Sequence, residues 1–328
     1  MIDPSLAGRI DLIGSRFTET PLVRLEHDRL RLYAKLELNN PHGSVKDRSA
    51  YLMLRRAIER AELTAASTVV ESSSGNLAIS LASFCRILGV PFVPVIDPTI
   101  NPSTERFLRA ACDQVEKVTE RDETGGFLRN RLLAVRRLES ALGNPYWPNQ
   151  YGNMDAADAH EEMTGAELSR ALDRIDYLFV GVGTGATVAG LSRRMKQRRP
   201  QTRIVAVDAE GSAIFGGSPG ARRIPGIGSS IRPPLVDQAQ IDDVVTVSES
   251  ATVDACHRLL RRHGLFAGGS SGSAYAAIEE YFQGYRGPPP SVVFLAVDRG
   301  TAYADTIYRP GWLDEWAARP AVTGRTRG

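Results

Sequence analysis

The chain reads YLFVGVGTGAT from residue 177 to residue 187. Its four leading apolar and aromatic residues predict a buried strand, and the glycines after them predict a tight loop that opens a helix. Glycines at such a junction let backbone N–H groups face an anion, and the helix dipole adds to the attraction. The stretch therefore predicts a strand, an anion-binding loop and a helix in succession, which is the repeating unit of an α/β fold.

This loop has two functional interpretations and one purely structural one. Read as G-x-G-x-x-A, with Asp208 at the end of the next predicted strand, it matches a dinucleotide-binding fingerprint. Read as GTGAT over residues 183–187, it forms a cup for one phosphate monoester, to which two threonine hydroxyls contribute. A plain tight turn is the third interpretation. The loop alone does not decide among them.

The same alternation of strands and helices extends on both sides of the loop. Further strands are predicted at residues 68–71, 92–96, 114–118, 204–207 and 291–297. Helices are predicted at residues 77–88, 104–111, 126–142, 253–262 and from the loop to about residue 198. Short apolar strands separated by helices are typical of parallel sheets with helices on both faces. The two series predict two α/β domains with a ligand-binding cleft between them.

Composition limits the classes of function. The 328 residues suit one large or two medium domains, and the net charge of +2 gives no reason to expect nucleic acid or an anionic membrane as a partner. No apolar run approaches roughly 18 residues, so neither membrane spanning nor export is expected. Three cysteines lie far apart without a C-x-x-C pair. We therefore expect reduced thiols, a cytoplasmic location and no structural metal.

Lys46 stands out because only four of the 40 basic residues are lysines. It lies in NNPHGSVKDR, residues 39–48, where a tight turn leads into a predicted helix. A guanidinium stays protonated, whereas a desolvated ε-amine can lose its proton and attack a carbonyl to form a Schiff base. A surface lysine at a loop–helix junction is the structural alternative.

Two other segments invite functional interpretations that the sequence does not support. GGSSG at residues 268–272 matches the nucleophile elbow of a hydrolase, but that fold needs a histidine after the serine and the last histidine is His263. The remaining interpretations of Ser270 are a helix cap and a hydroxyl that meets a ligand heteroatom. The acidic residues and histidine of 155–162 open a predicted helix, where we expect them to face solvent and not to bind a metal.

Taken together, these segments resemble the fold-type II pyridoxal-phosphate enzymes of the cysteine synthase and cystathionine β-synthase family. The similarity is carried, in the family's order and spacing, by residues 20–23, 43–48, 73–76, 183–187, 226–228 and 268–272. Residues 146–151, 204–212 and 298–300 are most similar to the N-(2-amino-2-carboxyethyl)-L-glutamate synthase branch of this family. The chain departs from the common loop Thr-Ser-Gly-Asn-Thr in having Ser73 and Leu77 at its ends.

The resemblance implies a role for each matching residue. Lys46 is expected to hold pyridoxal 5′-phosphate and to move the Cα proton of the substrate. Asn76 is expected to donate to the 3′ oxygen of the ring, and Ser270 to face the ring nitrogen. The phosphate cup would consist of Gly183, Thr184, Gly185, Ala186 and Thr187. The substrate would be bound by Ser73, Ser74, Gly75, Gln150, Gly228, Arg131 and Tyr151.

The implied reaction is β-replacement on an activated L-serine. We expect O-phospho-L-serine as the preferred substrate and the amine of L-glutamate as the nucleophile, toward 2,3-diaminopropionate. Arg131 and Tyr151 would hold the extra anionic groups, with Arg129 as a further candidate on the same predicted helix; a solvated arginine-rich face is the alternative. A cysteine synthase, a non-catalytic binding protein of this fold and a nicotinamide enzyme remain as alternatives.

The resemblance also implies a division of the chain. We expect a smaller, mobile α/β domain over residues 42–152 and a larger cofactor-binding domain over residues 1–41 and 153–318. Residues 319–328 are expected to form a flexible tail. A homodimer is expected as the assembly.

Overall fold

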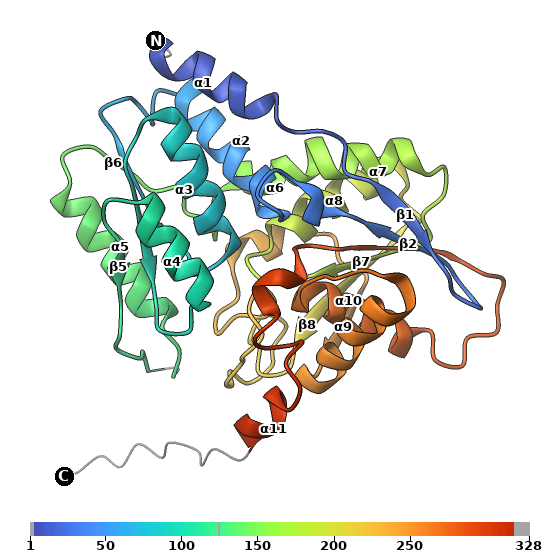
Figure 1. Cartoon of the computed structure of the whole chain (residues 1–328). Coiled ribbons are helices and arrows are strands. Elements are labelled where there is room, and N and C mark those ends of the chain that lie inside the picture. Colours follow the sequence, from blue (N-terminus) through green and yellow to red (C-terminus); the bar gives the residue numbers. More distant parts are fainter. Residues whose placement is uncertain (1–2, 124, 318–328) are drawn as a thin grey trace.

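Two β-sheets organise the chain, and both consist mainly of parallel strands (Figure 1). The computed structural model describes residues 3–123 and 125–317. The larger sheet has the strand order β1-β2-β10-β7-β8-β9, and the smaller sheet has the order β5-β4-β3-β6. Among the described strand pairs, only β1 with β2 is antiparallel. The predicted α/β class with parallel-rich sheets is confirmed.

Helices cover both faces of the larger sheet. Its strands are β1 (Leu22–Leu25), β2 (Arg31–Lys35), β10 (Ser291–Leu295), β7 (Tyr177–Gly181), β8 (Arg203–Ala209) and β9 (Asp243–Val247). Phe179 of β7 packs in a core with α9 (Glu249–His263) and α10 (Gly269–Tyr281). Its neighbour Leu178 packs in a second core with α7 (Gly165–Ala171) and α8 (Ala186–Arg198). Alternate residues of one strand therefore enter two cores, which explains the continuous apolar run.

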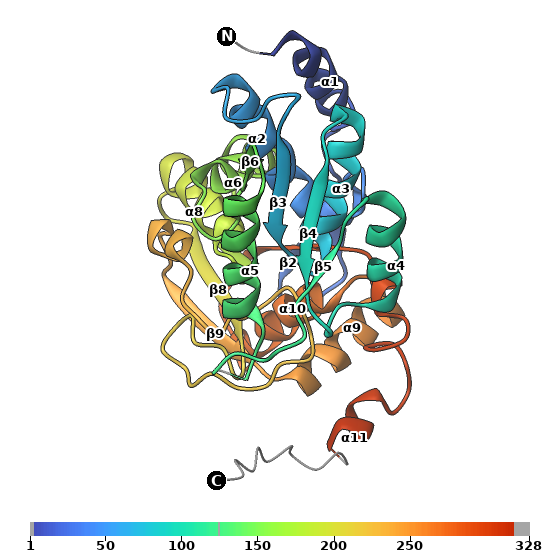
Figure 2. The ribbon, with the colours of Figure 1, turned by 90° about the vertical axis from the view of Figure 1, so that its left-hand side faces the viewer.

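The smaller sheet is covered in the same way, as Figure 2 shows for its two faces. Its strands are β5 (Glu116–Lys117), β4 (Phe92–Ile96), β3 (Thr68–Ser72) and β6 (Pro145–Tyr146). Val69 packs with α2 (Lys46–Glu59) and α3 (Asn76–Leu88), whereas Val70 packs with α5 (Leu128–Ala141). The first core also includes residues of α1 (Pro4–Gly14) and α4 (Pro102–Ala111). Helix α1 thus extends the layer formed by α2 and α3.

The remaining elements connect these layers. Helix α6 (Met154–Ala159) continues through a π-helical turn, His160–Thr164, into α7. Three 3-10 helices cover Glu37–Asn39, Pro234–Gln238 and Gly300–Tyr303, and α11 covers Trp312–Ala317. No described helix is long and apolar enough to cross a membrane. The tail predicted at 319–328 lies outside the described residues. The division into a smaller mobile domain and a larger cofactor-binding domain stays a prediction.

Strands β1, β2, β6 and β9 were not predicted, and three further elements differ from the sequence prediction. The strand predicted at 114–118 is reduced to β5, because this edge strand pairs with only the last two residues of β4. Helix α9 begins at Glu249 instead of residue 253, because the Ser248 hydroxyl caps it by accepting from the backbone N–H of Ala251. Helix α1 was not predicted; it begins after Asp3, which accepts from the N–H of Ser5.

Candidate active site

Lys46 is the first residue of α2, and its side chain enters a cavity at the carboxyl edge of the larger sheet. Its ammonium group lies 3.4 Å from the hydroxyl of Thr184, in the loop after β7. Burial disfavours the charged form and lowers the pKa of Lys46 to about 8, against the opposing charge of Glu71. A useful fraction of this amine is therefore neutral near neutral pH.

Buried charges anchor the helix that carries Lys46. The fully buried Arg48 donates to Glu37, with Nε 2.7 Å from Oε2, and to Glu167 on α7. Lys35 at the end of β2 also binds Glu167. Two cations and two carboxylates balance each other, so the cluster carries no net charge into the core. It ties the start of α2 to the larger sheet.

Loop 183–187 forms the expected cup at the start of α8. Gly185 has φ +91°, and a Cβ there would lie 2.8 Å from the backbone nitrogen of Val236. A side chain at Gly183 would likewise meet the carbonyl of Gly226 at 2.9 Å. The first N–H groups of α8 have no acceptor within the helix and carry its positive dipole. This geometry suits one phosphate group, as the sequence predicted.

A buried histidine supports this cup. The Nε2 atom of His160 lies 3.3 Å from the hydroxyl of Thr187 and 3.0 Å from that of Ser49. Its Nδ1 atom lies 3.3 Å from the hydroxyl of Thr164. Burial lowers the pKa of His160 well below its usual value, so the ring is neutral. Both ring nitrogens have partners when Thr164 donates to Nδ1 and the Nε2–H group donates to the hydroxyl oxygens of Ser49 and Thr187. The hydroxyl proton of Thr187 is then available to a phosphate oxygen.

The prediction that segment 155–162 faces solvent was wrong for Asp155 and His160, although Glu162 is exposed. His160 is fully buried in the π-helical turn, and Asp155 is buried against the guanidinium groups of Arg56 and Arg60. Tertiary packing brings these arginines from α2 to the segment, so the position of Asp155 at the start of a helix did not predict its burial. Within the part of the chain that the structure describes, no group of histidine, cysteine and carboxylate side chains is arranged to hold a metal ion.

Ser270 lies in the first turn of α10 and lines the cavity that Lys46 enters. Its hydroxyl would be 3.8 Å from a Cβ placed on Gly226. The structure therefore brings Lys46, the cup and Ser270 around one cavity. Its lining residues are Val45, Lys46, Val180, Gly181, Gly183, Thr184, Gly185, Thr187, Val188, Gly226, Ser270, Leu295 and Val297.

The predicted substrate loop, residues 73–76, lies between β3 and α3, and none of its residues lines that cavity. The hydroxyl of Ser73 accepts from the backbone N–H of Ala78, 3.2 Å away. The amide of Asn76 donates to the carboxylate of Asp298 at 2.7 Å, and that of Gln150 donates to the carbonyl of Ser72 at 2.8 Å. Both amides are thus oriented by protein groups.

Arg131 and Arg129 both belong to α5, but only the side chain of Arg131 contacts the substrate loop. The Nη1 atom of Arg131 donates to the hydroxyl of Ser74 at 3.1 Å, and its guanidinium is hydrogen-bonded to Tyr151. Burial raises the pKa of that tyrosine. The Arg131 side chain is only 13% exposed, so it does not belong to a solvated face. Arg129 points outward and pairs with Glu123.

Sequence reasoning missed Glu71, a fully buried carboxyl group near the end of β3. It accepts from the indole of Trp147 at 3.2 Å and from the backbone N–H of Gln150 at 3.1 Å. Burial raises the pKa of Glu71 to about 7. It ties the segment that contains Gln150 and Tyr151 to the substrate loop. A glutamate in an otherwise apolar strand was the available signal.

The profile of the family described as pyridoxal-phosphate-dependent enzyme matches residues 14–298 of the chain. The chain belongs to this family. It is 42% identical over 319 residues to the N-(2-amino-2-carboxyethyl)-L-glutamate synthase of Ralstonia nicotianae, covering 96% of this chain and 92% of that protein. The corresponding synthase of Cupriavidus metallidurans is 41% identical over 320 residues, covering 95% and 93%.

Solved structures confirm the fold of this pyridoxal-phosphate-dependent enzyme. The O-acetylserine-dependent cystathionine β-synthase of Helicobacter pylori superposes with a TM-score of 0.84 at 27% identity, covering 90% of this chain and 98% of that chain. The predicted family, cofactor and class, a transferase that acts by β-substitution, are confirmed. The nicotinamide interpretation of loop 183–187 and the non-catalytic alternative are therefore wrong.

The residues present fit pyridoxal phosphate. The helix start at 183–187 suits its phosphate, and the desolvated amine of Lys46 suits its aldehyde. The uncharged hydroxyl of Ser270 suits the ring nitrogen without enforcing its protonation. Gly226 leaves room for a flat ring between the cup and Ser270, because no side chain extends from it.

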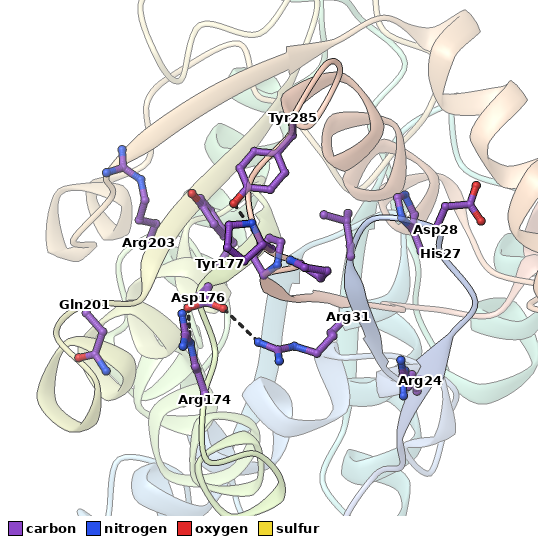
Figure 3. A pocket seen from close by; sticks show the side chains of 14 residues that line it. Arg24, His27, Asp28, Arg31, Arg174, Asp176, Tyr177, Gln201, Arg203 and Tyr285 are labelled. Atoms are coloured by element: carbon purple, nitrogen blue, oxygen red, sulfur yellow. Dashed lines mark hydrogen bonds and ion pairs between the residues drawn. The ribbon is translucent and has the colours of Figure 1, made fainter.

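Another cavity of the enzyme lies away from this site. It has a volume of about 660 Å³ and opens at the amino edge of the larger sheet, where Arg31, Tyr177 and Arg203 begin their strands. Figure 3 shows Arg174 and Arg31 on either side of Asp176 in this pocket. Catalytic sites of open parallel sheets form at the carboxyl edge. We therefore place no catalytic role in this cavity.

Proposed function

We propose that the enzyme converts O-phospho-L-serine and L-glutamate to N-(2-amino-2-carboxyethyl)-L-glutamate and inorganic phosphate. The Cβ–O bond of phosphoserine breaks, and the phosphate leaves with its electron pair. A bond forms between Cβ and the glutamate nitrogen, which loses one proton. The identity of more than 40% with two synthases named for this product supports the proposal.

One observation carries the choice of a phosphorylated substrate. Arg131 is buried beside the carboxylate-binding loop, and its Nε atom has no hydrogen-bond acceptor among the described residues. Asp97 approaches that atom to 3.3 Å as an ion pair. A buried guanidinium beside the substrate loop suits an anion that arrives with the substrate, because charge-assisted hydrogen bonds to phosphate are strong. An acetyl group carries no charge for this guanidinium to bind.

The protein groups have distinct tasks in the reaction. When bound, pyridoxal phosphate supplies an electron sink that makes the Cα proton acidic. Lys46 takes that proton on its amine, which burial makes a base of suitable strength. The helix start at residues 73–76 meets the substrate carboxylate, and Arg131 with Tyr151 holds the phosphate until it leaves. Closure of the loop over the cavity would exclude water from the reacting carbon.

Product analysis tests the proposal directly. The holoenzyme is given O-phosphoserine or O-acetylserine, each with glutamate or sulfide, and products are identified by mass spectrometry. We expect the glutamate adduct from phosphoserine as the main product. Efficient formation of cysteine without any glutamate adduct would replace this proposal with a cysteine synthase.

A further inference from the structure

The loop after β8 returns to the active site and forms one of its walls. Gly226 lines the cavity of Lys46, and the backbone N–H of Gly228 donates to the carbonyl of Val182 at 2.8 Å. Gly228 has φ +75° and cannot carry a side chain without strain. This part of the loop is therefore fixed against the phosphate cup, and Gly228 lies two residues from Gly226 in the cavity wall.

The side chain of Arg222 lies on Gly228. Its Cδ and Nε atoms are 3.0 and 3.1 Å from the position that a Cβ of Gly228 would occupy. Its Nη1 atom donates to the carbonyl of Gly211. Arg222 is half-buried, and burial lowers its pKa. A partly desolvated guanidinium thus lies beside Gly228, one of the predicted substrate-binding residues.

Arg222 forms no ion pair within the described residues. The negative charges of Asp208 and Glu249 act on it from a longer distance and oppose the lowering of its pKa. Asp208 accepts from the backbone N–H of Ala209 and is hydrogen-bonded to Ser212. Glu249 accepts from two backbone N–H groups and pairs with Arg223. Both carboxylates are therefore engaged elsewhere. A partly desolvated cation without an ion-pair partner favours binding of an anion.

The proposed reaction brings two anionic groups besides the carboxylate of the first substrate. The leaving phosphate is assigned to Arg131, on the side of the smaller sheet. The side-chain carboxylate of glutamate needs a second cation, because Arg131 is assigned to the phosphate. The attacking amine must reach the reacting carbon inside the cavity, so the far end of glutamate extends toward the rim. Arg222 is the unpaired cation of the loop that forms this rim.

We infer that Arg222 binds the side-chain carboxylate of the amino-acid nucleophile and so selects glutamate over neutral amino acids. This inference rests on the proposed function. It assigns Arg222 to the second substrate only, so neither cofactor binding nor departure of phosphate depends on it. A residue that merely held the loop together would affect both substrates, and the two roles can be separated.

The test compares glutamate with glutamine, which has nearly the same shape but a neutral side chain. In wild type we expect kcat/KM to favour glutamate. Arg222→Gln should raise the KM for glutamate roughly tenfold or more, with little change for glutamine, so that the preference disappears. Arg222→Lys should restore part of it. Arg232→Gln is the matched control, because Arg232 lies in the same loop but pairs with Asp237 and should leave the preference intact.

Two further measurements separate this inference from its alternatives. One is the burst of phosphate released from O-phosphoserine without nucleophile, and the other is the cofactor content after dialysis. Both should be unchanged in Arg222→Gln. Loss of the burst or of the cofactor would assign Arg222 to another ligand, and an unchanged preference for glutamate would also overturn the inference. If wild type itself ignores glutamate, the proposed function fails together with this assignment.

Discussion

Asn76 donates a hydrogen bond to Asp298 at 2.7 Å, although 222 residues separate them in the chain. The bond joins the start of α3, at the smaller sheet, to the segment after β10 of the larger sheet. Asp298 is buried, and its second oxygen has no hydrogen-bond partner among the described residues. One N–H of the Asn76 amide is thus engaged, and the predicted contact with the ring oxygen of the cofactor would use the other.

We expect Asn76→Ala to destabilise the enzyme by roughly 1–3 kcal/mol, because a buried carboxylate loses a donor. Asn76→Asp should be worse at neutral pH, since it would place two carboxylates side by side. Denaturant unfolding of the apoenzyme measures both changes, and the absorbance of the holoenzyme reports the lost contact with the ring. Equal stability of the two variants would contradict an interaction between residue 76 and Asp298.

Lys46 should be the attachment point of the cofactor. Reduction of the holoenzyme with borohydride, followed by peptide mapping, should place the label on this residue. Lys35 provides an internal control, because it is buried in an ion pair with Glu167 and is not free to react. Lys46→Ala should lose the label and nearly all turnover, since the same amine holds the cofactor and moves the proton. A label on Lys35 would refute the assignment.

Glu71 should make stability depend on pH. Its folded pKa of about 7 lies above the usual 4.5, so the folded state favours the protonated form. The resulting stabilisation is fully present below pH 4.5 and is lost as the pH rises to about 7. Its full size is roughly 3 kcal/mol. The stability advantage of wild type over Glu71→Gln should therefore shrink across this interval.

The measurement is urea unfolding of the two apoproteins at several pH values from 4.5 to 8. Since other carboxyl groups titrate in both proteins, only the difference between the proteins reports Glu71. A constant difference would mean that Glu71 is ionised in the folded protein throughout, as its three hydrogen-bond donors would favour.

His160 should act through the phosphate cup. His160→Phe removes the donor to Thr187 and leaves the hydroxyls of Ser49 and Thr164 without their ring partner. We expect the dissociation constant of pyridoxal phosphate to rise roughly tenfold. His160→Gln should keep part of the affinity, because an amide can still donate. Titration of the apoenzymes measures this, and equal affinity in all three proteins would show that the cup does not need the histidine.

The sequence predicted most of the strands and helices, because buried strands such as β3 and β7 are short apolar runs that can be recognised from neighbouring residues alone. The glycine loop and Lys46 were also recognisable, since their chemistry depends on neighbouring residues. The burial of His160, Glu71 and Asp298 was not predictable in this way. Each is enclosed by groups from distant segments, as the indole of Trp147 encloses Glu71 from 76 residues away. Polar residues acquire such environments only through tertiary packing.

Arg131 should distinguish phosphorylated from acetylated substrates, and Arg129 offers a matched control two residues away. Arg131→Ala should lower kcat/KM for O-phosphoserine tenfold or more, because a charge-assisted interaction contributes about 1.5–3 kcal/mol. Arg129→Ala should change little, since that side chain is exposed and pairs with Glu123. Turnover of O-acetylserine with sulfide should be nearly unaffected in both variants. Equal losses for both substrates in Arg131→Ala would show instead that Arg131 positions Ser74 and the carboxylate loop rather than the phosphate.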